Sequence, residues 1–200
     1  LQVNAHDGKA GDNMVKFSKV LLSQPELSEV DRLKVSYASE LLRNESIKTV
    51  LYGVLFFLLG YFPEFLLCLA MSCTVRIFSG GIHLKTNVGC FFMGLVTTGA
   101  EILLLPRLPL LQPDYLVVLW ISVALICLLS PIASYKRPFK TKERYRLCKR
   151  WSILLTLGWS LVLTFVLAPS YLQHCGIWYL VIQAAQLIMQ SVYRYFKQAK

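Results

Sequence analysis

Long apolar runs, separated by short charged segments, constrain this chain more than any other feature of its sequence. A helix that crosses a bilayer needs about 20 mostly apolar residues, within a range of about 17–25. Four of the runs are that long, whereas the first two are shorter and separated only by Pro63 and Glu64. We therefore expect an all-α, polytopic membrane bundle of about six transmembrane helices, the first two being short spans or a hairpin. The runs occupy residues 50–62, 65–75, 88–105, 115–134, 151–168 and 171–192.

The composition excludes several other classes of protein. Hydrophobic residues make up 56% of the chain and charged residues only 16%, whereas a soluble domain carries about 25% charged residues. This deficit argues against a disordered chain, a coiled coil and most soluble enzymes. The net charge of +10 would suit nucleic acid or an anionic membrane surface. Because the basic residues follow the loops and form no face with interleaved aromatic residues, we expect anionic lipids and no nucleic acid as partners.

The positions of Lys and Arg predict how the chain crosses the membrane, because positive side chains collect in cytoplasmic loops. Here 20 of the 21 lie on segments that alternate onto one face, with seven in residues 1–48 and eight in the loop 135–150. We expect both termini in the cytoplasm, a membrane part at 49–193 and a cytoplasmic tail at 194–200.

The cytoplasmic segment 1–48 is expected to contain an amphipathic helix. Apolar residues recur every three or four positions from Leu27 to Leu41, after Pro25, which is a common residue at helix starts. Such a helix can lie at the membrane surface or pack on the cytoplasmic face of the bundle.

Residues 76–90, RIFSGGIHLKTNVGC, differ from the rest of the chain. They place two glycines, a histidine and a polar patch before a cysteine that enters the third apolar run. A thiol is a weak nucleophile until a neighbouring base or cation makes it a thiolate. His83 can be the base for Cys90, and Arg76 can add a positive field. Alternatively, His83 is an interfacial polar residue and Cys90 a small buried hydrophobe.

Geometry sets a condition on this pair. If all the residues from His83 to Cys90 were helical, the two side chains would lie about two turns, roughly 10 Å, apart. A catalytic pair therefore requires residues 85–89 to loop back. Gly80 and Gly81 can let the backbone approach a bound peptide closely, or can supply amide donors for an oxyanion.

Five of these residues together resemble the signature of the accessory gene regulator B family, bacterial membrane cysteine peptidases that process quorum-sensing peptide precursors. They are Arg76, Gly80, Gly81, His83 and Cys90. The N-terminal region and the string SPIASYKRPF also fit the family, so the resemblance covers nearly the whole chain. The six-span, cytoplasm-facing arrangement of the family matches the expectation from the charges.

The resemblance implies an enzyme in the bacterial cell membrane whose substrate is a propeptide. Cys90 would attack a peptide carbonyl with His83 as base, and the thioester would close to a thiolactone or lactone. Within the basic loop, Lys136 and Arg137 are candidate contacts for an acidic tail of the propeptide, and a second copy of the chain is a further candidate partner. No metal or other cofactor is expected, since no Cys/His group has zinc-ligand spacing.

No acidic residue lies close in sequence to orient His83, and Asn87 is the nearest candidate for that role. The other His–Cys pair, His174 and Cys175, is a poorer candidate site because adjacent residues rarely align for proton transfer. It is also expected on the outer face, away from a cytoplasmic precursor.

Polar residues inside the apolar runs leave a second function open. Glu101 is a functional suspect because carboxylates are rare within spans, although it can simply reach the outer interface. Gln183, Gln186 and Gln190 form a polar stripe on the last run, which can join helices or line a peptide groove. In a small peptide exporter or transporter without covalent chemistry, these residues would line the path.

Overall fold

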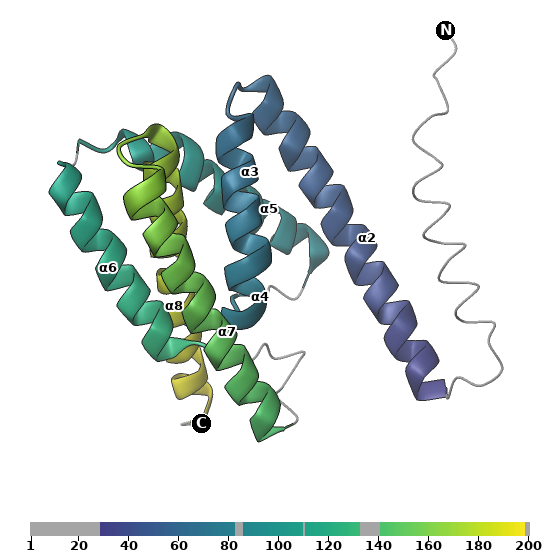
Figure 1. Ribbon diagram of the computed structural model, residues 1–200. Helices are drawn as coiled ribbons and strands as arrows, with labels where there is room; N and C mark the ends of the chain where they lie inside the picture. Colours follow the sequence, from purple (N-terminus) through teal and green to yellow (C-terminus); the bar gives the residue numbers. More distant parts are fainter. Residues whose placement is uncertain (1–28, 83–85, 110, 133–140, 199–200) are drawn as a thin grey trace, which may run out of the picture. The chain divides into compact units, whose positions relative to one another are not determined.

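A computed structural model describes residues 29–82, 86–109, 111–132 and 141–198, and within these ranges every regular element is a helix (Figure 1). His83, Lys136 and Arg137 lie outside the described residues. The chain divides into two compact units, residues 1–54 and 55–200, and each is described by itself.

In the first unit, α2 (Glu29–Leu58) carries the end of the expected cytoplasmic segment and the start of the first apolar run on one uninterrupted helix. The sequence contains neither Gly nor Pro between positions 29 and 52, so nothing in it breaks the helix at residue 48. Near that position Lys48 and Glu45 form an ion pair at 2.7 Å. The apolar side chains Val50, Leu51 and Val54 are exposed.

The second unit begins with a tight reversal between the first two apolar runs. Gly60 has φ +80°, and the Tyr61 amide donates to the Phe56 carbonyl at 2.8 Å. The rings of Phe56 and Phe65 then stack with centroids 5.6 Å apart. The chain continues through α3 (Phe62–Met71), η1 (Ser72–Arg76) and α4 (Ile77–Ser79) as one helical stretch.

The all-α membrane bundle predicted from the sequence is confirmed. Among the described residues, four helical stretches are long and apolar enough to cross a membrane: Phe62–Ser79, Asn87–Arg107, Gln112–Leu129 and Tyr171–Phe196. The first of the four is longer than the second apolar run, because the helix continues past Val75 through the charged Arg76. Of the remaining two runs, the first lies mostly on α2, and the fifth lies on α7 (Lys142–Leu161) and η4 (Val162–Val166).

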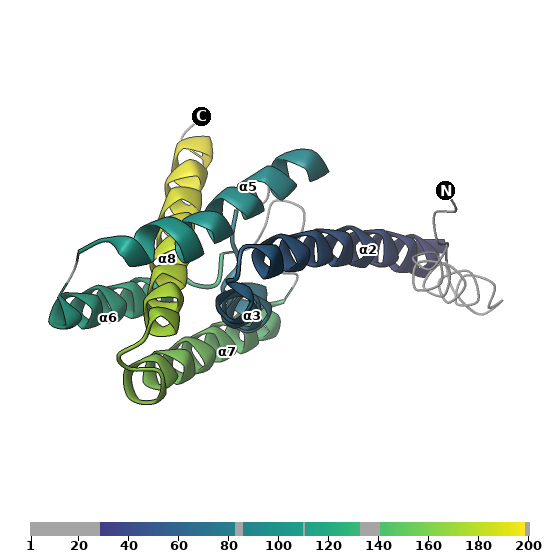
Figure 2. The same cartoon turned by 90° about the horizontal axis from the view of Figure 1, so that it is seen from above.

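Helix α8 is the element around which the second unit packs. In both views it lies among α3, α5, α6 and α7 (Figures 1 and 2), and half of its membrane-capable stretch is buried, against 11% of the stretch that contains α5. Of the four stretches, the one that contains α5 therefore leaves the largest share of its surface for contact with lipid. The elements are α5 (Asn87–Gly99), η2 (Ala100–Leu104), η3 (Leu105–Arg107), α6 (Gln112–Leu129), α7 (Lys142–Leu161), η4 (Val162–Val166) and α8 (Tyr171–Gln198).

Buried glutamine side chains help to join the helices. Near the start of α8, the fully buried Gln173 donates to the Leu163 carbonyl at 3.0 Å and accepts from Gln112 at 2.8 Å. Gln173 therefore joins neighbouring helices, as expected of a glutamine in an apolar bundle, where an amide without a hydrogen-bond partner is costly.

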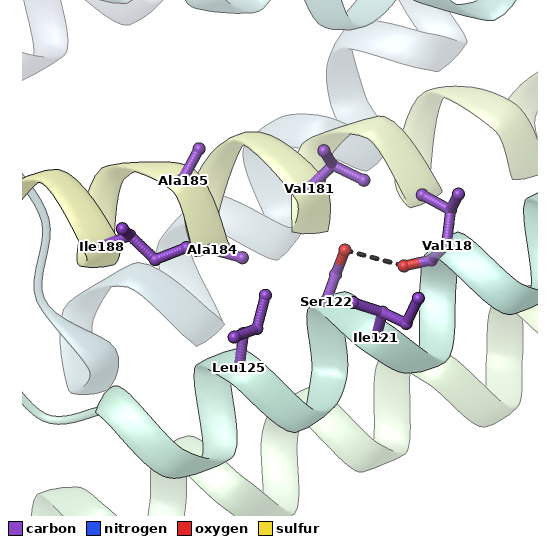
Figure 3. Close-up of a pocket in the computed structure, with 8 residues that line it drawn as sticks. All are labelled: Val118, Ile121, Ser122, Leu125, Val181, Ala184, Ala185 and Ile188. Carbon is purple, nitrogen blue, oxygen red and sulfur yellow. Dashed lines mark hydrogen bonds between the residues drawn. The ribbon is translucent and has the colours of Figure 1, made fainter.

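A groove of about 250 Å³ lies between α6 and α8 (Figure 3). It is apolar except for Ser122, whose hydroxyl donates to the Val118 carbonyl of its own helix at 2.8 Å. None of the candidate site residues lines it. Its lining residues are Val118, Ile121, Ser122, Leu125, Val181, Ala184, Ala185 and Ile188.

Candidate active site

The helical stretch that starts at Phe62 ends in a fixed turn formed by the residues of the predicted motif. Gly80 adopts φ +85° and ψ −171°, a conformation that is essentially restricted to glycine. Its amide donates to the Arg76 carbonyl at 3.0 Å, and the Arg76 guanidinium donates forward to the Ile82 carbonyl at 3.1 Å. A Cβ at Gly81 would lie 3.0 Å from Arg76 Nε, so Gly81 leaves room for this side chain. The structure thus brings Arg76, Gly80 and Gly81 together.

This geometry corrects one predicted role of Gly80. Its amide cannot serve as a free oxyanion donor, because it is already hydrogen bonded to the Arg76 carbonyl at the helix end. Another part of this chain approaches Gly80 closely, whereas the predicted approach of a bound peptide stays a prediction. A Cβ at Gly80 would clash with the Ile132 carbonyl oxygen, and the Ile132 amide donates to the Ser79 carbonyl at 3.0 Å.

The contact at Ile132 has a consequence for the basic loop. Ile132 is the last described residue before the segment that contains Lys136 and Arg137. The chain therefore enters that segment directly beside the Ser79–Gly80 turn, and the first basic residue follows four positions later.

Cys90 lies in the first turn of α5. Thr86 is the N-cap of this helix, its hydroxyl accepts a hydrogen bond from the Gly89 amide at 3.1 Å, and the Cys90 amide donates to the Thr86 carbonyl at 3.1 Å. The Cys90 side chain is half-buried and Asn87 is exposed.

The start of α5 also corrects the predicted loop. A His83–Cys90 pair was predicted to require that residues 85–89 loop back, but residues 87–89 are already helical because Thr86 caps the helix. Any change of direction that brings His83 toward Cys90 must therefore occur between Ile82 and Thr86. His83 lies in that interval, outside the described residues, and the His83–Cys90 pair stays a prediction.

The other predicted residues occupy the interior of the second unit. Glu101 lies in η2 and is only 5% exposed, so it is buried within the protein and does not reach out to the interface. Gln183 is buried and donates to the Ser79 hydroxyl at 2.8 Å and to the Gly80 carbonyl at 2.7 Å. Gln186 is buried as well.

The second His–Cys pair, His174 and Cys175, is packed against other side chains of the bundle. The His174 ring stacks on the Tyr115 ring with centroids 3.9 Å apart and an interplanar angle of 6°, and Cys175 is fully buried. Both observations favour a packing role for these two residues.

Two features that position the site were not predicted from the sequence. Thr86 could have been found, since Thr is a preferred N-cap residue and stands directly before the apolar run. The role of Lys149 could not: its ammonium group, on α7, donates to the carbonyls of Cys127, Leu128 and Ser130 at the end of α6. No pattern in the sequence indicates which backbone carbonyls the side chain of Lys149 will reach.

Replacing Thr86 with valine should lower any activity that depends on Cys90 more than the loss of another helix cap does. Loss of an N-cap costs about 0.5–2 kcal/mol, and here the first turn that frays is the one carrying Cys90. Thr141 is a matched control, because it caps α7 and accepts from the Arg144 amide at 3.2 Å. We expect similar losses of thermal stability for Thr86→Val and Thr141→Val, but a fall in the rate of that activity, about tenfold per 1.4 kcal/mol, only for the former. Equal rates in the two variants would contradict this role.

Comparison with known proteins decides the family. The family described as Accessory gene regulator B matches residues 15–187. The chain belongs to this family. The match includes the whole motif from Arg76 to Cys90 as well as the basic loop. The resemblance predicted from the sequence is thereby confirmed.

Individual members of the accessory gene regulator B family are distant in sequence but similar over most of their length. An AgrB-like protein of Clostridium beijerinckii is 27% identical over 164 residues, which cover 82% of this chain and 80% of that protein. Accessory gene regulator protein B of Staphylococcus carnosus is 23% identical over 175 residues, covering 86% and 88%. No solved structure matches the chain significantly. Membership of this family, together with the four membrane-capable helices, identifies a membrane protein that takes part in processing for accessory gene regulator quorum sensing.

Proposed function

We propose that this protein is a cysteine endopeptidase that removes the C-terminal part of a quorum-sensing propeptide through a thioester on Cys90. Membership of the accessory gene regulator B family supports the substrate class. The observation that carries the chemistry is the position of Cys90. Its side chain is half-buried and lies in the first turn of a membrane-capable helix, ten residues after the hydrogen-bonded turn at Gly80. Such a thiol is sheltered from bulk water yet lies next to the segment that supplies the base.

In the first step, His83 accepts the thiol proton and the sulfur of Cys90 attacks a peptide carbonyl of the propeptide. The C–N bond breaks, the new amine takes a proton from His83, and the C-terminal fragment leaves. The N-terminal part remains bound as a thioester. The Arg76 guanidinium fixes the carbonyl of Ile82, the residue before His83, and so limits where the imidazole can lie.

In the second step, a Cys or Ser side chain within the bound peptide attacks the thioester. Its proton passes to His83 and then to the Cys90 sulfur, which leaves as the thiol, and the ring closes as a thiolactone or lactone. Exchange of one thioester for another is nearly isoenergetic, so ring closure needs no ATP provided that water is excluded. A site at the start of a membrane-capable helix favours such exclusion.

The proposal includes a multi-pass arrangement with both termini in the cytoplasm, where the propeptide is made. The segment with Lys136 and Arg137 then faces the same side and begins beside the Ser79–Gly80 turn. It would contact anionic lipids and an acidic part of the propeptide. A second copy of the chain remains a candidate partner.

The test is mass spectrometry of the purified protein in lipid with its precursor peptide. Wild type should form a covalent adduct on Cys90 and release a C-terminal fragment, because the acyl-enzyme holds only the N-terminal part. Cys90→Ala and His83→Ala should do neither. Cys73→Ala is the control, since Cys73 is an exposed thiol on η1 in the same unit, and it should react as wild type does.

Two results would contradict the proposal. Cleavage that survives Cys90→Ala would mean that another residue is the nucleophile. No adduct and no cleavage by folded wild type would instead favour a peptide exporter or transporter without covalent chemistry, in which Cys90→Ala leaves peptide transport across the vesicle membrane unchanged.

A further inference from the structure

The backbone that leads into the catalytic segment is held at three carbonyls where the helix ends. The Ser79 carbonyl accepts from the Ile132 amide, the Gly80 carbonyl from Gln183, and the Ile82 carbonyl from Arg76. Carbonyls at a helix C-terminus have no partner within their own helix and are costly to bury unmatched. Of these three donors, Gln183 alone is a side chain from a different helix.

Gln183 is built for this contact. It is 1% exposed, and its amide nitrogen donates to the Ser79 hydroxyl at 2.8 Å and to the Gly80 carbonyl at 2.7 Å. A primary amide has two N–H donors, so these two bonds use both. The Ser79 hydroxyl in turn donates to the Gly80 carbonyl at 3.3 Å, which closes a small network around the turn.

We propose that Gln183 is a positioning residue for the peptidase, and that it acts by fixing the Ser79–Gly80 turn from which the chain departs toward His83. This inference rests on the proposed function. Gln183 bonds to the carbonyl of Gly80, which lies three residues before His83 in the sequence, and its proposed role is to hold this backbone. A misplacement of about 1 Å at a reacting group can cost about a hundredfold in rate, and loosening this turn would allow displacements of that size.

The chain offers a matched control on the same helix. Gln173 is also fully buried on α8, donates to a backbone carbonyl (Leu163) at 3.0 Å and bonds to one side chain (Gln112) at 2.8 Å. Its contacts lie at the other end of the second unit's helices and involve none of the motif residues. Gln183→Met and Gln173→Met remove the same amide from equally buried positions of one helix, so their structural costs should be alike.

The experiment compares single-turnover cleavage of the precursor peptide by the two variants in lipid. We expect Gln183→Met to lower kcat about 10- to 100-fold with KM within about twofold, because peptide binding stays and alignment is lost. Gln173→Met should keep kcat within about twofold while losing as much thermal stability. A Gln183→Met variant with wild-type kcat, or a Gln173→Met variant with the same loss of kcat at equal stability, would overturn the inference.

Hydrogen–deuterium exchange of the peptide that spans residues 79–90 separates this inference from the proposed function. Faster exchange there in Gln183→Met, but not in Gln173→Met, is expected whether or not the protein cleaves peptides. If wild type does not cleave and form the Cys90 adduct, the proposed function fails, and Gln183 then has no positioning role in catalysis. Unchanged exchange in Gln183→Met would show that the amide does not hold the turn, and would overturn the inference even in an active peptidase.

Discussion

The Gly80→Ala variant should lose most of its folded population in lipid, together with its peptidase activity. Gly80 has φ +85° and ψ −171°, a region that costs a residue with a side chain about 1–3 kcal/mol. The new Cβ would also clash with the backbone carbonyl of Ile132, which cannot swing aside as a flexible side chain could. Together these effects predict a loss of about 3 kcal/mol or more in the free energy of unfolding.

Gly60 is the matched control for this prediction. It has φ +80°, but a Cβ added there would meet no atom within 4 Å. Gly60→Ala therefore isolates the conformational cost, about 1–2 kcal/mol, without the clash. Thermal unfolding of both variants in the same lipid measures the difference, and equal losses would show that the Ile132 contact does not constrain position 80.

The membrane bundle could be predicted because its causes are repeated along the sequence. Each long apolar run must be buried from water, and the basic loops appear at alternate ends, so many residues contribute to one conclusion. The second run was nevertheless judged too short. Its charged neighbour Arg76 continues the helix to Ser79, because its guanidinium turns to the Ile82 carbonyl. A single hydrogen bond of this kind leaves no periodic signal.

The chemistry of the site could be predicted further than its geometry. The sequence indicates a thiol, a base and two glycines, and family membership agrees with that combination. It does not indicate that Gly80 is needed for its approach to Ile132, or that Gln183 reaches Ser79. Those partners are 52 and 104 positions away along the chain, and their register depends on how the helices pack.

Local geometry was mispredicted where two signals competed. Asn87 and Gly89 would allow the loop that a His83–Cys90 pair requires, but the N-cap at Thr86 outweighs them and starts the helix at Asn87. The π-helical turns in η1 and η2 likewise shift which side chains share a face. A pattern based on 3.6 residues per turn does not anticipate such turns, so the burial of Glu101 could not be predicted from spacing alone.

Replacing Lys149 with methionine should destabilise the second unit more than any other loss of a basic side chain on α7. The Lys149 ammonium group donates to the Leu128 carbonyl at 3.1 Å and to the Ser130 carbonyl at 2.5 Å, and it also bonds to the Cys127 carbonyl. It thereby neutralises the C-terminal end of α6, where carbonyls lack partners within their helix and partial negative charge collects. Hydrogen bonds to charged groups contribute about 1.5–3 kcal/mol, so a loss of about 2 kcal/mol is expected.

The effect should reach the catalytic segment, because Ser130 lies two residues before the Ile132 amide that binds the Ser79 carbonyl. Arg150→Met is the control: Arg150 is the exposed neighbour of Lys149, and its loss removes the same charge from the same helix. Thermal unfolding and single-turnover cleavage, measured in the same lipid, should both fall for Lys149→Met and stay near wild type for Arg150→Met. If both variants lost equally, the charge of the basic loop, and not the cap on α6, would be what stabilises this end of the bundle.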